Sequence, residues 1–163
     1  MVVNDSQSFR GSFLMYGMIM LETPTLILII VLWQTGNLGK DGPMTVGIVA
    51  GLMLLTFILL MSIKLDLRMD EKSLAFRFPP FGNKWKKIMK EDVQSINVKQ
   101  LDGIFEYGGI GWRLSRKQTA YVFPADHVIE VQLNRKKLVF STKKPKEVEE
   151  MIANWKEGNH HVS

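Results

Sequence analysis

The chain has 163 residues, and its 21 Lys and Arg outnumber its 16 Asp and Glu, which gives a net charge of +5. The absence of cysteine excludes disulfides, thiolate metal sites and a thiol nucleophile. The basic excess is confined to residues 64–163, which hold 19 of the cations and 13 of the acids, a net of +6. That part of the chain is therefore expected to meet an anionic partner.

Two apolar runs follow an expected cytoplasmic tail over residues 1–12, and they cover residues 13–33 and 44–63. A helix of about 20 residues spans the roughly 30 Å hydrocarbon core of a bilayer. The linker between the runs, QTGNLGKDGP, has one Lys and one Asp, whereas Arg10 precedes the first run and several cations follow the second. By the positive-inside rule we predict a two-helix transmembrane hairpin over residues 13–63 of a multi-pass cell-membrane protein, with both termini and the following domain in the cytoplasm.

Both runs contain residues that are unusual in lipid. Glu22 lies in the middle of the first run, two positions before Pro24. An intramembrane carboxyl group is a functional candidate, but the interpretation we favour is a protonated group bonded to backbone or hydroxyl groups near Pro24. In the second run, Gly47-x-x-x-Gly51 is a small-xxx-small pattern. We expect Gly47 and Gly51 to pack against the first helix, and a homo-oligomer contact is the alternative.

From Lys64 onward the polarity alternates with a period of two, which is typical of half-buried strands. The segments KLDLRMD and SLAFRF predict a β-hairpin, and Pro79-Pro80 ends its second strand because proline has no N–H to donate. Further strands are predicted over residues 85–89, 93–100, 110–115, 119–123, 128–133 and 137–141.

The sequence closes with a predicted helix that begins near Pro145, and residues 158–163 are expected to form a flexible tail. The apolar residues of this helix have helical spacing, and we expect them to cover one end or face of the sheet. They are Val148, Met151, Ile152 and Trp155. The predicted fold is therefore a membrane α-helical hairpin plus a mainly-β domain over residues 64–157. This domain has the outline of a PH-like (pleckstrin-homology-like) antiparallel barrel of about seven strands closed by a C-terminal helix.

Three segments carry a resemblance to a family: FRFPPFGNKWKKIMKEDVQSINV, EYGGIGWRLSRKQTAYVF and FSTKKPKEVEEMI. They resemble small bacterial proteins in which a PH-like domain follows one or two transmembrane helices. The resemblance covers most of residues 64–157, and the chain departs from the family pattern at Asn134-Arg135-Lys136-Lys137, where a glycine is expected. Most members of this family have no assigned function, so the resemblance implies the fold and says little about function. Its most specific stretch is Tyr107-Gly108-Gly109-Ile110-Gly111-Trp112-Arg113.

Two basic clusters are candidate binding surfaces. The first is a hypothetical lipid-surface contact made of Lys84, Trp85, Lys86, Lys87 and Lys90, whose four lysines contribute at most about 4 kcal/mol beside an anionic membrane. The alternative is a core position for Trp85 and Ile88, with the lysines on a solvated strand. The second, weaker cluster is a basic rim of Arg135, Lys136, Lys137, Lys143 and Lys144.

The glycine-rich stretch is interpreted as structural. It lacks the lysine and hydroxyl pair of a phosphate-binding P-loop, and no helix follows it. The members of this loop are Tyr107, Gly108, Gly109, Gly111, Trp112 and Arg113.

No catalytic motif is present, and the histidines are His127 and the pair His160-His161. We therefore predict a non-enzyme without cofactor or metal. The first functional hypothesis is a membrane-anchored PH-like interaction module that scaffolds an unknown protein partner, contacts anionic lipid headgroups, or does both. Barrels of this kind commonly bind peptides at open sheet edges. The alternative is an accessory subunit of a larger membrane complex that acts through Glu22, Gly47 and Gly51. Membrane lipids and a possible homo-oligomer are the further partners, and nucleic acid is not expected.

Overall fold

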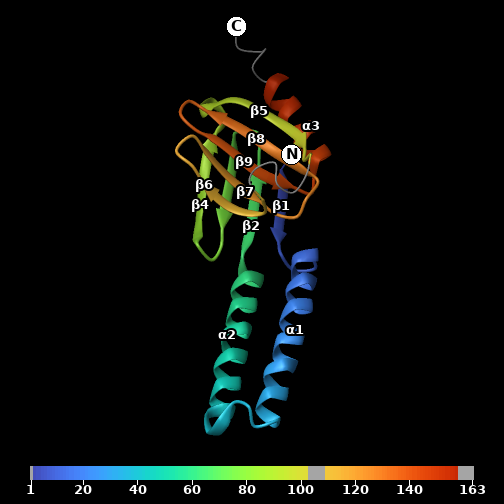
Figure 1. Ribbon diagram of the computed structural model, residues 1–163. Helices are drawn as coiled ribbons and strands as arrows, with labels where there is room; N and C mark the ends of the chain where they lie inside the picture. The colour runs from blue at the N-terminus through green and yellow to red at the C-terminus, as the bar shows by residue number, and fades with distance from the viewer. Residues whose placement is uncertain (1, 103–108, 158–163) are drawn as a thin grey trace. The chain divides into compact units, whose positions relative to one another are not determined.

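The computed structural model describes residues 2–102 and 109–157, and the chain divides into two compact units (Figure 1). One unit, called here the β unit, combines Met1–Ser8 with Lys64–Ser163, and the helical unit is Phe9–Ile63. Tyr107, Gly108 and the expected tail over residues 158–163 lie outside the described residues.

The helical unit consists of α1 (Phe13–Gln34), the short 3-10 helix η1 (Gly39–Asp41) and α2 (Gly42–Ser62). Both long helices are long and apolar enough to cross a membrane. The two predicted apolar runs are thus confirmed as helices. Pro24 lies inside α1, and no residue of that helix is buried.

The first sheet has the strand order β1-β2-β3-β4 and is antiparallel throughout. Its strands are β1 (Val3–Ser8), β2 (Lys64–Met69), β3 (Ser73–Phe78) and β4 (Gly82–Met89). The start of the chain therefore differs from the expected tail, because β1 pairs with β2 from Val3 opposite Met69 to Ser8 opposite Lys64. Residues 1–8 and 64–157 form one folded unit although the helices separate them in the sequence.

The second sheet has the order β5-β8-β9-β7-β6 and follows the 3-10 helix η2 (Lys90–Asp92). The pair β7·β9 is parallel, so the expectation of an entirely antiparallel domain is wrong at this pair. The hairpin β8-β9 places β9 between β8 and β7, and β9 then runs in the direction of β7. The strands are β5 (Val93–Gln100), β6 (Gly111–Leu114), β7 (Gln118–Val122), β8 (His127–Leu133) and β9 (Lys137–Thr142).

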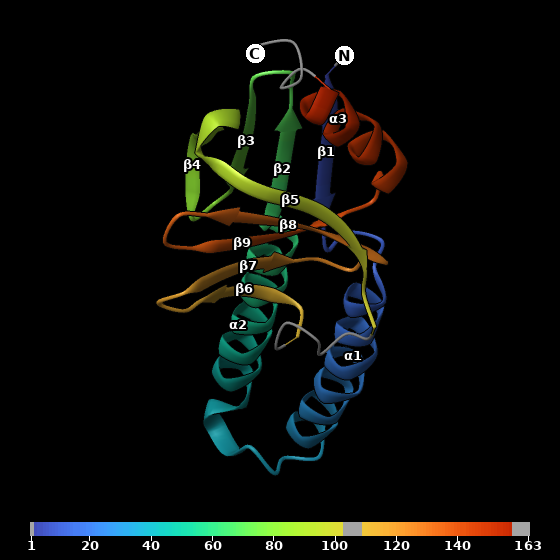
Figure 2. The same ribbon diagram turned by 90° about the horizontal axis from the view of Figure 1, so that it is seen from above.

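The two sheets lie face to face with their strands crossing, and α3 (Pro145–Glu157) lies beside β1 and β5 (Figure 2). Aromatic rings fill the space between the sheets, with the Phe76 ring centroid 4.7 Å from that of Phe140 and 5.4 Å from that of Tyr121. The predicted stripe of α3 is confirmed, since its four apolar residues are buried. Within the described residues the sheets have four and five strands and do not join into a closed barrel.

Buried polar side chains of β1 connect the two sheets. The Gln7 amide donates to the Ser141 carbonyl at 2.6 Å and accepts from the Ser141 hydroxyl at 2.7 Å. The Asp5 carboxylate accepts from the Thr142 hydroxyl at 2.8 Å and from the Lys143 backbone N–H at 2.9 Å. Buried polar groups need such partners, so β1 is held to β9 by side chains as well as to β2 by its backbone.

Candidate functional site

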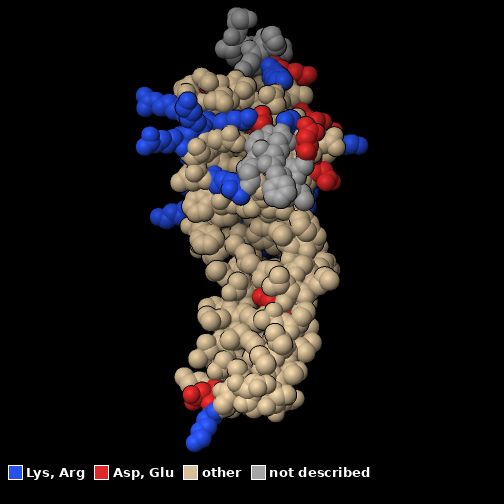
Figure 3. All heavy atoms as spheres, in the orientation of Figure 1, with Lys and Arg blue, Asp and Glu red and all other residues tan. Residues whose placement is uncertain are grey.

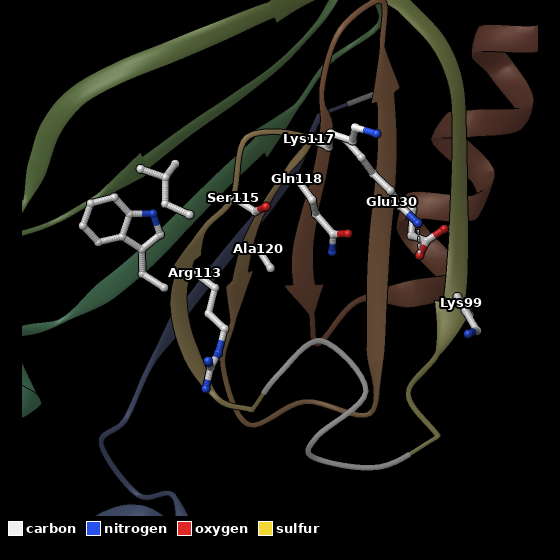
Figure 4. Close-up of a pocket in the computed structure, with 10 residues that line it drawn as sticks. Lys99, Arg113, Ser115, Lys117, Gln118, Ala120 and Glu130 are labelled. Atoms are coloured by element: carbon white, nitrogen blue, oxygen red, sulfur yellow. Dashed lines mark hydrogen bonds and ion pairs between the residues drawn. The ribbon is translucent and has the colours of Figure 1, made fainter.

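An open groove of about 840 Å³ lies over the face of the second sheet that is turned away from the first sheet (Figure 4). Strand alternation explains its lining, because Tyr121 and Phe140 point toward Phe76 in the core and their neighbours point the other way. Ala120 of β7 lies on the floor of the groove, and it belongs to a buried apolar cluster with Val122, Val128 and Val139. Around this floor, polar side chains from β5, β6, β7 and β8 reach into the groove.

Cations dominate the polar lining of the groove. Lys99 and Arg113 lie at opposite sides, and Lys117 comes from the β6-β7 turn (Figure 4). Lys137 also lines the groove, and its ammonium group forms an ion pair of 2.7 Å with Glu130, the acidic residue in the lining. Four cations against one carboxylate leave a net positive charge in a concave site, which favours an anionic ligand.

Two of these cations have no acidic partner among the residues that the structure describes. Within the described part of the chain, no hydrogen bond or ion pair links the side chain of Arg113 or Lys117 to an acid. A backbone hydrogen bond of 2.9 Å from Lys137 N–H to the Lys117 carbonyl joins the β6-β7 turn to the start of β9. Lys and Arg gather over the β unit in Figure 3, on the side where the turns of the strand hairpins lie.

The structure divides the first predicted cluster between two faces of the edge strand β4. Lys84 and Lys86 line a pocket between the sheets, whereas Lys87 is paired opposite Ala75 on the outer face. Trp85 also lies on the outer face, where the guanidinium of Arg77 is 4.8 Å from its ring centroid. Trp85 is 46% exposed and therefore not a core residue. Lys90 begins η2 beyond the strand.

The second predicted cluster is also divided. Arg135 and Lys136 lie in the β8-β9 turn and Lys137 starts β9, whereas Lys143 and Lys144 follow the other end of that strand. Lys144 forms an ion pair of 3.4 Å with Glu147 of α3. The turn that the structure brings to Lys137 is instead the one that contains Lys117.

The described part of the glycine-rich stretch contains two backbone conformations that favour glycine. Gly109 and Gly111 have φ angles of 100° and 121°, in the region that side chains rarely adopt. Trp112 and Arg113 belong to β6 and point to opposite faces, Trp112 toward Tyr121 and Arg113 into the groove. Arg113 therefore lines the groove, a position that the sequence pattern did not indicate.

A smaller pocket of about 110 Å³ opens between β3-β4 and β6-β7. Its wall is aromatic, because the Trp112 ring stacks on Tyr121 with centroids 6.5 Å apart and on Phe81 with centroids 6.4 Å apart. Burial raises the pKa of the Tyr121 phenol above its ordinary value, although a hydrogen bond with Trp112 acts in the opposite direction. The phenol is thus neutral at physiological pH and packs as an aromatic ring.

The remaining predicted residues, Glu22, Gly47 and Gly51, lie in the helical unit. Glu22 is half-buried, and within the described residues its carboxyl group has no hydrogen bond or ion pair. The hydroxyl groups of three threonines in the helical unit each donate to a carbonyl of their own helix; they belong to Thr23, Thr25 and Thr56. Gly47 and Gly51 do not pack against α1, because a Cβ atom added at either would have no other atom within 4 Å.

No protein-family model matches the chain, and neither a curated protein nor a solved structure matches it. Among the described residues, no group of three or more His, Asp or Glu is placed to hold a metal ion. The guanidinium and ammonium groups that line the groove are groups that can hold an anion by charge-assisted hydrogen bonds.

Proposed function

We propose that this protein is a PH-like interaction module anchored at the inner face of a bacterial cell membrane, and that its β unit recruits a protein partner through an acidic segment. The observation that carries the proposal is the convergence of four cations on one groove, two of them without an acidic partner in the described chain. A peptide segment with several carboxylates is complementary to this surface.

Two features support the anchored PH-like part of the proposal. The helices α1 and α2 are long and apolar enough to cross a bilayer, and cations are concentrated in the sequence outside them. In the β unit, sheets of four and five strands cross and a C-terminal helix packs beside them, which agrees with the predicted mainly-β domain that ends in a helix.

The free edge of the second sheet supports the proposal that the partner binds as an extended segment. Strand β6 is the last strand of that sheet, and in the described residues it pairs with β7 on one side only. An unpaired edge accepts an added strand through its backbone N–H and C=O groups. Side chains of such a strand alternate between faces, so every second residue reaches the side of the sheet where Arg113 lies.

The test is a crosslinked pull-down of the full chain from its native membranes. We expect an Arg113→Glu, Lys117→Glu double variant to lose the co-purifying protein, because removing two favourable charge contacts and adding two repulsions weakens binding about tenfold or more. The matched control is Lys143→Glu, Lys146→Glu, which makes the same charge change outside the groove. Equal recovery of the protein with both variants contradicts the proposal. Loss of bound anionic lipid in place of a protein would instead identify the groove as a lipid site.

A second candidate, an accessory subunit of a membrane complex, is supported by the open face around Gly47 and Gly51. Small residues on an uncovered helix face allow another helix to approach closely. A Gly47→Ile, Gly51→Ile variant has room for its side chains within the chain and is expected to fold normally. Loss of a co-purifying membrane protein, or of a homo-oligomer, in this variant supports the second candidate, and an unchanged set of partners contradicts it.

A further inference from the structure

The β unit carries a cluster of exposed apolar side chains that its own core does not need. Phe81 is 59% exposed, Trp112 is 49% exposed and Leu114 is 69% exposed. We call these three residues the aromatic rim. Phe81 comes from the turn between β3 and β4, and the other two come from the edge strand β6.

The rim is a continuous and supported surface. The rings of Phe81 and Trp112 are stacked with an interplanar angle of 29°, and Phe81 also stacks on the buried Phe78 with centroids 5.9 Å apart. Leu114 is two residues beyond Trp112 on the same face of β6, so the two side chains are neighbours. The aromatic pocket supports the rim from below and presents two lysines beside it, Lys84 and Lys86.

Chain connectivity places the rim near the point where α2 leads into the β unit. Lys64, the first residue of β2, donates its backbone N–H to the Pro79 carbonyl at 3.0 Å. Lys64 follows the last residue of α2, Ser62, by two positions, and Phe81 follows Pro79 by two positions. Two residues span at most about 7 Å, and the Cα atoms of the two hydrogen-bonded residues are at most about 7 Å apart. Phe81 therefore lies within roughly 21 Å of the end of α2.

We propose that the aromatic rim inserts into the headgroup layer of the bilayer that anchors the chain, with Lys84 and Lys86 meeting anionic lipid phosphates. The proposal rests on the membrane anchoring stated above and adds a second contact between the protein and the membrane. Trp and Phe are favoured at the membrane interface, and nearby lysines are attracted to anionic leaflets.

Other exposed apolar residues of the β unit lack this combination. Trp85 lies on the opposite face of β4 and is covered in part by Arg77, and Met89 lies at the end of β4 farthest from the β3-β4 turn. The rim combines stacked aromatic rings, adjacent cations and proximity to the end of a candidate membrane helix. Trp112 and Leu114 also line the groove, so the rim and the groove adjoin. The stacked rings and cations of the rim fit a lipid surface better than the acidic protein segment proposed for the groove.

The absence of cysteine in the chain permits a direct test. The full chain is reconstituted into vesicles of phosphatidylcholine and phosphatidylglycerol, with one introduced cysteine carrying an environment-sensitive fluorophore. The rim is probed with Phe81→Cys and Leu114→Cys. Met89→Cys is the matched control on the same β unit, and Val31→Cys in α1 reports whether the helices are in lipid.

We expect the labels at residues 81 and 114 to be quenched by brominated lipid, with a several-fold loss of quenching by an aqueous quencher relative to the label at residue 89. Replacing phosphatidylglycerol with phosphatidylcholine is expected to reduce this protection. Aqueous accessibility at residues 81 and 114 equal to that at residue 89, with residue 31 in lipid, overturns the rim proposal and leaves the anchoring intact. A water-accessible label at residue 31 overturns the anchoring and the rim together.

Discussion

Two buried threonines with opposite environments allow a matched prediction at the residue scale. Thr119 is 2% exposed, and its hydroxyl group has no hydrogen-bond partner among the described residues. Thr142 is 1% exposed, and its hydroxyl group donates to Asp5 at 2.8 Å and accepts from the Lys144 N–H at 3.1 Å. A buried hydroxyl without a partner costs free energy, whereas one with two partners stabilises the fold.

We therefore expect Thr119→Val to raise the free energy of unfolding by about 1 kcal/mol, since valine keeps the shape and removes the unpaired group. Thr142→Val is expected to lower it by about 1 to 3 kcal/mol, because Asp5 and Lys144 each lose a partner. Urea unfolding of the full chain in detergent micelles, followed by near-ultraviolet circular dichroism, measures both values. Destabilisation of similar size in the two variants would contradict this assignment of the two hydroxyl groups.

Asp70 links the stability of the β unit to pH. Burial acts to raise the pKa of its carboxyl group, but hydrogen bonds from the Lys72 N–H, the Ser73 hydroxyl and the Ser73 N–H, together with the charge of Lys87, lower the pKa below the ordinary value. A pKa that is lower in the folded chain stabilises the fold above the unfolded-state pKa, about 3.9 for Asp, and this contribution is lost as the pH falls through the folded-state pKa.

The free energy of unfolding is accordingly expected to decrease when the pH is lowered below about 4. This decrease is expected to be smaller in Asp70→Asn than in the unchanged protein. At neutral pH the variant is expected to be about 1 kcal/mol less stable, because an amide oxygen accepts these hydrogen bonds more weakly than a carboxylate. Unfolding curves at several pH values below and above 4 measure both effects, and the exposed Glu149→Gln is the control. An unchanged acid dependence in Asp70→Asn would show that other carboxyl groups determine it.

At the scale of elements, local sequence patterns were sufficient to predict a helix or strand wherever its buried face is apolar. The strand β3 and the helix α3 begin where the sequence predicts, because alternation and helical spacing place their apolar residues on one face and prolines mark the ends. Strand β1 was missed because its buried positions are Val3, Asp5 and Gln7. Two of these three residues are polar, and only their bonds to Thr142 and Ser141 make them inward-facing.

Pairing between distant strands could not be predicted for a different reason. The alternation of a strand shows which residues share a face, but it does not show which strand lies beside it. The parallel pair β7·β9 and the meeting of Lys117 with Lys137 depend on that order. The cations of the basic groove are scattered along the sequence, so no pattern in the sequence indicated that they meet. The lysines of β4 are nearly contiguous in the sequence and therefore looked like one surface, but strand alternation divides them between two faces.

At the scale of the whole molecule, the β unit is discontinuous in sequence. Its first strand precedes both helices and its remaining strands follow them, so the chain enters and leaves the helical unit through neighbouring strands. Ser8 and Lys64 are directly paired, and a short turn can therefore join them in place of residues 9–63. Residues 64–163 alone lack β1, which leaves one edge of β2 unpaired and removes the Gln7 acceptor of the buried Ser141 hydroxyl.

We expect a fusion of residues 1–8 through an Asn-Gly turn to residues 64–163 to fold as a water-soluble unit with cooperative unfolding. The chain 64–163 without β1 is expected to be less stable by about 3 kcal/mol or more, a large fraction of the 5–15 kcal/mol of a typical domain. Urea unfolding followed by near-ultraviolet circular dichroism compares the two, and a fusion with residues 3–8 in scrambled order controls for the added length. Since the scrambled strand keeps the composition but loses the inward positions of Asp5 and Gln7, it is expected to behave like the chain without β1. Equal midpoints for all three chains would mean that β1 adds no stability to the β unit. Residues 3–8 would then behave energetically like the tail that the sequence predicts.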